Sequence, residues 1–197
     1  MNNNNIYAIA IIPAKGTSTR LPGKNLKNIN NKTLVEYAID YAKTSKYIHE
    51  IYISTDDNEI KAIAEANNVI WIDRPNNLLG EAEVADIYVD LMKKIDNNKV
   101  THVVGLQPDH PDRQNILDDM LHYFIEKKYM DLVTVDKNGT RNGSVRIVKA
   151  EYVRSGVMSR RVGAMVDDCT NVEHEWQLES AKKRIEKGNY YASKFKS

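Results

Sequence analysis

Short apolar runs alternate with amphipathic stretches along most of the chain. The apolar runs, which predict strands, cover residues 6–12, 51–54, 69–72, 100–106 and 131–135. Between them, apolar residues recur at spacings of three and four, which predicts helices over 33–43, 57–67, 81–95 and 113–127. This alternation predicts an α/β fold with a mostly parallel, doubly wound sheet that is covered by helices on both faces.

The pattern changes after residue 136. A polar, glycine-containing turn is predicted over 137–143, followed by a strand over 144–148, a short apolar run over 162–166 and a terminal helix over 172–187. We therefore expect a single domain over 1–197. It would consist of a core over 6–136, a smaller lobe over 137–168 and a terminal helix region over 169–187.

The amino-acid composition argues against several classes of protein. The chain has 197 residues, of which 42% are hydrophobic, so it can form a core without disulfides or a structural metal. Lys and Arg number 28 against 27 Asp and Glu, a balance that argues against a general nucleic-acid binder. Cys169 is the only cysteine, which excludes an internal disulfide and a cysteine-based zinc site. No secretory signal or apolar run of about 18 residues is evident, so we expect a cytoplasmic protein that does not span a membrane.

Ligands of doubly wound sheets bind at the carboxyl ends of the strands, which directs attention to the loops after residues 12, 72 and 106. The first of these, 13–25, holds two glycines, three hydroxyl side chains, two lysines and an arginine. Such a loop can bind a triphosphate through backbone N–H groups and cations. It has neither the Walker ending nor the dinucleotide glycine spacing. The alternative is a surface loop with incidental charge.

The sequence Ser-Thr-Arg-Leu-Pro-Gly-Lys at 18–24, preceded by Ile-Pro-Ala at 12–14, resembles the signature loop of the cytidylyltransferases that activate acidic sugars, the CMP-Kdo and CMP-sialate synthetases. Similar segments follow at 51–57, 73–75 (Asp-Arg-Pro) and 106–111 (Leu-Gln-Pro-Asp-His-Pro). The resemblance covers about residues 6–135 and the terminal helix. It implies a Rossmann-like nucleotide-diphospho-sugar transferase fold.

The resemblance implies an enzyme that converts CTP and an acidic acceptor to a CMP-acceptor and pyrophosphate, with Mg²⁺ as cofactor. Catalytic roles fall to Lys24, Arg20 and Asp109, with the two cations on the phosphates. The family usually has Arg where Lys15 stands, so bidentate phosphate contact is lost there. The implied nucleotide-binding residues are Pro13, Ala14, Lys15, Gly16, Thr17, Ser18, Arg20, Lys24, Asn25 and Arg74.

Two carboxylates are implied as metal ligands. Asp109 matches the aspartate that holds magnesium in the Kdo branch, and alignment of 176–178 on the family's last helix makes Glu173 the second ligand. Asp168 is the alternative second ligand. Glu173 can also be explained as a carboxylate that the helix dipole favours.

On the acceptor side, the resemblance points to Gln107, His110 and Arg113. The resemblance implies a nonulosonate or Kdo-like sugar acid as the acceptor. The family's insertion before the last strand is reduced here to residues 137–161, which makes a smaller acid, such as a phosphonate, an alternative. A homodimer is possible, but the segment that packs across the dimer in relatives is mostly missing. Cations for an acidic acceptor are available in this region, although a solvated surface explains them equally well: Arg141, Arg146, Arg154, Arg160 and Arg161.

Two other functions stay open. The chain can be a nucleotidyltransferase that uses another triphosphate on a sugar phosphate. It can also be a catalytically degenerate relative that binds a nucleotide or a partner, as the reduced lobe and the changes at Lys15 and Glu173 would suggest.

Overall fold

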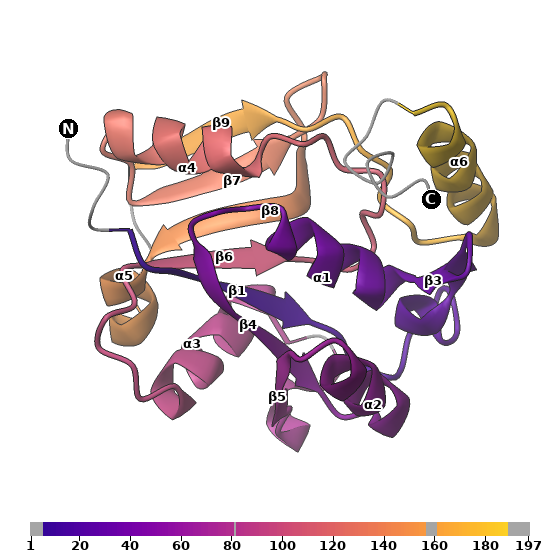
Figure 1. Cartoon of the computed structure of the whole chain (residues 1–197), viewed down its shortest axis with the longest axis horizontal. Coiled ribbons are helices and arrows are strands. Elements are labelled where there is room, and N and C mark those ends of the chain that lie inside the picture. The colour runs from indigo at the N-terminus through magenta and orange to yellow at the C-terminus, as the bar shows by residue number, and fades with distance from the viewer. Residues whose placement is uncertain (1–5, 81, 157–160, 189–197) are drawn as a thin grey trace.

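The computed structural model describes residues 6–80, 82–156 and 161–188, and its centre is a seven-stranded sheet (Figure 1). The strand order is β5-β4-β1-β6-β8-β7-β9. Neighbouring strands are parallel except that β8 is antiparallel to both β6 and β7, which confirms the mostly parallel α/β fold. The strands are β1 (Ala8–Pro13), β4 (Ile48–Thr55), β5 (Ile70–Asp73), β6 (His102–Leu106), β7 (Asp131–Val135), β8 (Arg141–Lys149) and β9 (Val162–Val166).

Helices cover both faces of the sheet. On one face the core is formed with α1 (Leu34–Lys43), α2 (Asn58–Ala66), α4 (Leu117–Glu126) and α6 (Glu175–Glu186). The other face packs against α3 (Val84–Lys94) and α5 (Ala150–Ser155). The central strand β1 is buried on both sides: Ala8, Ala10 and Ile12 face the first core, while Ile9 and Ile11 face the second. No helix in the described ranges is long and apolar enough to cross a bilayer.

Capping side chains set the starts of two helices. The Thr33 hydroxyl accepts from the Glu36 N–H and the Glu36 carboxylate accepts from the Thr33 N–H, a reciprocal capping box at the start of α1. The Asp57 carboxylate caps α2 by accepting from the N–H groups of Glu59 and Ile60. Polar residues between the apolar segments therefore fix where these helices begin.

Several predicted boundaries were wrong. The helix predicted from residue 113 begins at Leu117, because the residues before it bond to the segment after β9: the Gln114 N–H donates to the Asp167 carboxylate, and the Asp112 carboxylate accepts from the Thr170 N–H. The turn predicted over 137–143 is shorter, since β8 begins at Arg141. The pattern also missed α5, the hairpin of β2 (Asn28–Ile29) and β3 (Lys32–Thr33), and the short 3₁₀ turns η1 (Lys24–Leu26) and η2 (Asn76–Leu78).

Arg113 lies in the interior of the fold, between the end of β6 and β8. Its side chain is fully buried, and the guanidinium donates to the backbone carbonyls of Gln107, His110 and Ser144. It also lies over the Tyr41 ring, 5.2 Å from the ring centroid. The guanidinium therefore fixes the loop after β6 and ties it to β8.

We expect Arg113→Met to lower the free energy of unfolding by about 3 kcal/mol, because three buried carbonyl groups lose their donor. Urea unfolding measures the change. Arg154→Met is the matched control, since Arg154 also donates to two carbonyls but is exposed, and it should cost less than about 1 kcal/mol. Equal losses in the two variants would contradict the assigned role of Arg113.

His102 at the start of β6 makes stability depend on pH. Burial, with a smaller effect of Lys149, lowers the pKa of His102 to about 4. In the unfolded chain the pKa is about 6.5, so as pH falls from about 6.5 toward 4 the unfolded state takes up a proton that the folded state does not. Folding stability therefore falls over that window, by up to about 3 kcal/mol.

We expect His102→Gln to flatten this part of the stability profile, measured as the free energy of unfolding at several pH values between 4 and 7. The same substitution at the exposed His49 should leave the slope as in the wild type. An unchanged slope in His102→Gln would show that other groups cause the pH dependence.

Candidate active site

The loop that follows β1, residues 14–25, is held against the end of β4. The Ala14 N–H donates to the Ser54 carbonyl and the Gly16 N–H to the Asp56 carboxylate, while the Asn25 amide donates to the Lys15 carbonyl. A side chain at position 16 would not fit, since a Cβ there would lie 2.6 Å from Oδ2 of Asp57. The sequence thus fixes this loop at the carboxyl edge of the sheet, where the strand pattern predicted a ligand.

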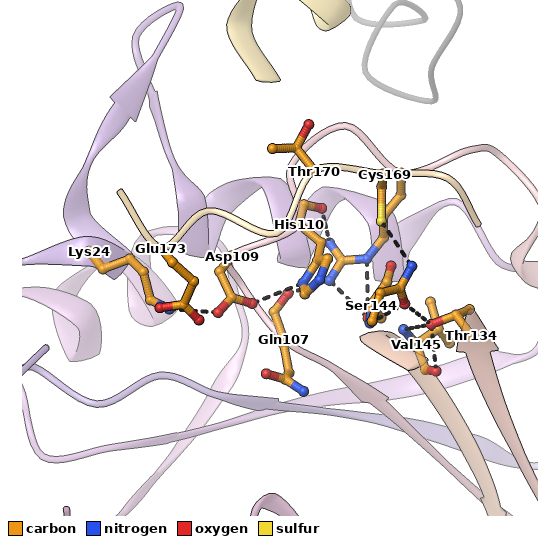
Figure 2. Close-up of polar contacts among 12 residues, drawn as sticks. Lys24, Gln107, Asp109, His110, Thr134, Ser144, Val145, Cys169, Thr170 and Glu173 are labelled. Carbon is orange, nitrogen blue, oxygen red and sulfur yellow. Dashed lines mark hydrogen bonds and ion pairs between the residues drawn. The ribbon is translucent and has the colours of Figure 1, made fainter. Parts of the chain in front are cut away.

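Three predicted site residues meet at one point beside this loop (Figure 2). The Lys24 Nζ atom lies 2.6 Å from Oδ2 of Asp109 and 3.5 Å from Oε2 of Glu173. Arg20 adds a second cation, its Nε lying 3.1 Å from the same Glu173 oxygen. Side chains from two distant parts of the chain thus join those of the loop after β1 in one cluster of two cations and two carboxylates.

Backbone contacts explain how Glu173 reaches Asp109. The Val172 N–H donates to the Asp109 carbonyl over 2.8 Å, so the residue after Val172 lies next to Asp109. The same segment is held farther along, where Thr170 donates from its N–H and its hydroxyl to the Asp112 carboxylate. The segment before α6 is therefore attached to the loop after β6 along its length. Of the two alternatives for the second metal ligand, the structure brings Glu173 to Asp109, whereas no ion pair among the described residues joins Asp168 to this cluster.

Asp109 is buried and is charged at neutral pH. Burial alone would raise the pKa of Asp109, but His110 and Lys24 outweigh this effect and hold the pKa well below its usual range. The His110 ring is also buried, with Nδ1 2.9 Å from Oδ1 of Asp109 (Figure 2). No hydrogen bond to Nε2 of His110 is found among the described residues. Asp109 thus keeps a negative charge inside the protein by its contacts with neighbouring side chains.

The cluster has the chemistry to hold a hard divalent cation. Carboxylate oxygens are the protein ligands that Mg²⁺ prefers, and Mg²⁺ is usually bound by one or two carboxylates with phosphate oxygens and water completing the set. Asp109 and Glu173 already share one cation, the Lys24 ammonium. Among the described residues, no group of three or more Asp, Glu, His or Cys side chains is placed so that it could hold a metal ion. The residues therefore suit a metal that a bound triphosphate helps to hold.

The other predicted nucleotide-binding residues lie on the same edge but outside this cluster. Lys15 donates from Nζ to the Gly80 carbonyl over 2.8 Å, toward the loop after β5. Arg74 is buried on the end of β4, where it donates to the hydroxyl and the carbonyl of Ser54. Burial lowers the pKa of Arg74 to about 10, so the guanidinium stays charged at neutral pH. Pro13 ends β1, Thr17 is exposed, and Ser18 accepts from the Leu21 N–H.

Of the three predicted acceptor residues, only Gln107 lines the cavity described below. Arg113 is buried, its guanidinium donates to backbone carbonyls, and it is not among the residues that line the cavity described below. Gln107 lies at the end of β6 and lines a cavity of about 600 Å³. Gly143, with a φ of 76°, approaches the Gln107 amide so closely that a Cβ would lie 2.5 Å from its nitrogen. His110 is buried beside Asp109, away from this cavity lining.

The cavity lies between the start of α3, β8 and α5, on the second face of the sheet. The sequence had not indicated Tyr88 or the acidic residues Glu83 and Asp86 on its wall, because helical spacing makes them look like ordinary core and surface positions. The lining is Glu83, Val84, Ala85, Asp86, Tyr88, Val89, Gln107, Arg141, Asn142, Gly143, Arg146, Val148, Tyr152, Val153 and Gly156.

Of the arginines proposed as cations for an acidic acceptor, two line this cavity. Arg141 is exposed there, whereas Arg146 is buried and makes a bidentate contact with the buried Asp131. Arg154 and Arg161 instead donate to backbone carbonyls elsewhere. Arg160 lies outside the described residues. Arg141 is thus the arginine most available to an anionic ligand.

Comparison with solved structures agrees with this architecture. A structure described as CMP:2-keto-3-deoxy-manno-octonic acid synthetase complexed with CTP superposes with a TM-score of 0.74. The match covers 91% of this chain and 98% of that one at 15% sequence identity, a level that shows a shared fold.

Curated relatives match over shorter segments. The chain is 30% identical over 133 residues to a 3-deoxy-manno-octulosonate cytidylyltransferase of Bdellovibrio bacteriovorus, a match that covers 64% of this chain and 49% of the relative. It is 35% identical over 103 residues to an 8-amino-3,8-dideoxy-manno-octulosonate cytidylyltransferase of Shewanella woodyi, covering 51% of this chain and 40% of the relative. The chain thus spans about half the length, or less, of these curated relatives.

A family model described as cytidylyltransferase matches residues 9–191, which include every strand of the large sheet except the first residue of β1. The match also includes the loop of Lys24 and both carboxylates that meet it. The chain therefore belongs to the cytidylyltransferase family.

Proposed function

We propose that the protein is a Mg²⁺-dependent enzyme that transfers CMP from CTP to an acidic acceptor, a Kdo-like sugar acid or a smaller acid. The observation that carries the proposal is the meeting of Lys24 with Asp109 and Glu173 at the carboxyl edge of the sheet. Membership of the family makes a cytidine nucleotide the expected donor. The names of the relatives supply the class of acceptor.

In the proposed reaction an oxygen of the acceptor attacks the α-phosphorus of CTP. The bond between this oxygen and phosphorus forms as the bond from phosphorus to pyrophosphate breaks, and a hydroxyl nucleophile gives up its proton. Little covalent chemistry is left to the protein in such a transfer, so positioning and charge stabilisation dominate. Lys24 and Arg20 lie together on the loop after β1 and would hold the phosphates of the leaving pyrophosphate.

Asp109 and Glu173 would hold the metal. A bound Mg²⁺ supplies charge neutralisation of the phosphates and helps to orient them for in-line attack. Asp109 suits this role because it stays ionised although it is buried. The bond from Val172 to the Asp109 carbonyl keeps Glu173 within reach of the same ligand.

The acceptor would bind in the cavity of about 600 Å³ beside Gln107. That volume lies within the usual range for pockets that bind small molecules. Arg141 offers an exposed cation for the acid group, and the amide of Gln107 offers a donor for a hydroxyl. The wall also holds Glu83 and Asp86, which can accept hydrogen bonds from the hydroxyls of a sugar.

We expect CTP with Mg²⁺ to raise the melting temperature, since a ligand at about 100 times its Kd adds about 2.7 kcal/mol of stability. Asp109→Asn should remove the Mg²⁺-dependent part of this shift and lower pyrophosphate release from CTP with Kdo by about 100-fold or more, because one metal ligand loses its charge.

Asp90→Asn is the control for Asp109→Asn, because Asp90 makes a surface ion pair on α3 and should behave as the wild type. Absence of any shift with CTP and Mg²⁺ in the wild type would contradict the proposed function. A shift with UTP, ATP or GTP in place of CTP would point to a different nucleotidyltransferase.

We expect Arg141→Gln to raise the KM of an acidic acceptor by about tenfold while the KM of CTP stays within about twofold, since a charge-assisted contact is lost from the acceptor alone. Steady-state kinetics with Kdo as acceptor measure both constants. Arg161→Gln is the control, because Arg161 donates to the Lys127 carbonyl and does not line the cavity. A rise in the KM of CTP instead would place Arg141 on the nucleotide.

A further inference from the structure

The Lys24 ammonium lies where the proposed metal ligands converge. Its nitrogen is 2.6 Å from Asp109 and 3.5 Å from Glu173, and each of these contacts is made to a carboxylate oxygen. The three side chains are largely enclosed, with 14%, 9% and 18% of the side-chain surface of Lys24, Asp109 and Glu173 exposed. Water therefore screens these contacts only partly.

The position of Lys24 is fixed by the chain on both sides. Gly23 has a φ of 63°, a left-handed conformation that glycine adopts without strain, and Lys24 then begins the 3₁₀ turn η1. The Lys24 N–H donates to the Leu21 carbonyl. A second lysine one turn on, Lys27, pairs with Glu175 at the start of α6. The loop after β1 thus presents Lys24 to the carboxylates from a defined backbone.

A divalent cation and the ammonium would compete for the same oxygens. Both are positively charged, and at the short distance imposed by a shared carboxylate their repulsion in a partly dry site is large. The two carboxylates, for their part, repel each other unless a cation lies between them. One cation must therefore be present, and the addition of a second one requires that the first one moves or that new negative charge arrives.

We propose that Lys24 acts as a stand-in for the metal in the free enzyme, so that a divalent cation enters this site only together with the nucleoside triphosphate. The triphosphate would supply the negative charge that draws the ammonium from Asp109 and Glu173 onto the phosphates. Lys24 would then have two partners in sequence, carboxylates first and phosphates afterwards. This inference rests on the proposed function, and it adds an obligatory coupling of metal and nucleotide.

The coupling is reciprocal. If CTP raises the affinity of the site for a divalent cation by some factor, the cation raises the affinity for CTP by the same factor. Loss of the Lys24 charge should weaken the coupling, because the carboxylates become available to a cation without nucleotide. We therefore expect Lys24→Met to bind a divalent cation in the absence of nucleotide more tightly than the wild type does.

The test is calorimetric titration with Mn²⁺ alone, in the absence of nucleotide. We expect the Kd of Lys24→Met for Mn²⁺ to be about tenfold lower, or more, than that of the wild type, because a competing charge is removed. Lys24→Arg keeps the charge and should bind Mn²⁺ as weakly as the wild type. Lys24→Met with Asp109→Asn should lose the gained affinity, which shows that the new site is this one.

Lys27→Met is the matched control. Lys27 lies three residues after Lys24, at the end of η1, and also pairs with a carboxylate, Glu175, but no ion pair joins it to Asp109 or Glu173 among the described residues. It should leave the Kd for Mn²⁺ unchanged. In Lys24→Met, Mn²⁺ should also raise the melting temperature more than in the wild type, which gives a second readout that does not depend on activity.

Tight binding of Mn²⁺ by the wild type without nucleotide would overturn the inference, and so would an unchanged Kd in a folded Lys24→Met. If Lys24→Met does not fold, Lys24→Gln repeats the test with a polar neutral side chain, and the dependence of the Kd for CTP on Mn²⁺ in the wild type decides the coupling by itself. Failure of the proposed function is recognised separately, because the wild type would then show no melting shift with CTP and Mg²⁺.

Discussion

The Arg113 guanidinium, buried between the end of β6 and β8, fixes the backbone that carries Asp109. It donates to the carbonyls of Gln107 and His110, which lie on either side of Asp109 in the chain, and to Ser144 on β8. A short loop held at both flanks has little freedom to move. Because β8 is antiparallel to β6, its start lies beside the end of β6, which is what lets one side chain reach both.

The same loop then positions the segment before α6. Asp167, Thr170 and Val172 each bond to a residue between Asp109 and Gln114, so the two segments run together. Glu173 comes directly after the last of these contacts and reaches Lys24. Geometry thus explains why the carboxylate at 173 meets the loop after β1. Glutamate is one methylene longer than aspartate, and its backbone is held by the bond from Val172 to Asp109.

Much of the fold and part of the site could be predicted from the sequence. β7 has the predicted limits because an apolar run bounded by polar residues defines a short, largely buried strand. β9 coincides with the apolar run over 162–166, although three of its five residues are exposed at the edge of the sheet. The start of α4 could not be predicted from local helical periodicity. It depends on hydrogen bonds between segments far apart in the sequence, in which the Asp112 and Asp167 carboxylates accept from the N–H groups of Thr170 and Gln114. The burial of Arg113 could not be predicted either, because the neighbouring sequence of an arginine in a loop does not show whether its side chain is exposed or buried. Lys24, Asp109 and Glu173 were found through motifs, but spacing cannot show that one ammonium joins them.

The charge balance of this cluster connects stability with binding. A buried carboxylate is tolerated only when opposite charge or hydrogen-bond donors compensate for the loss of water. For Asp109 that compensation comes from Lys24 and His110, and for Glu173 it comes from Lys24 and Arg20. The residues that would bind the phosphates therefore also stabilise the carboxylates that would bind the metal. A ligand that brings its own negative and positive charges can replace these contacts in one step, whereas a lone cation or a lone anion leaves part of the cluster uncompensated. This charge balance is the physical basis of the proposed coupling between metal and triphosphate.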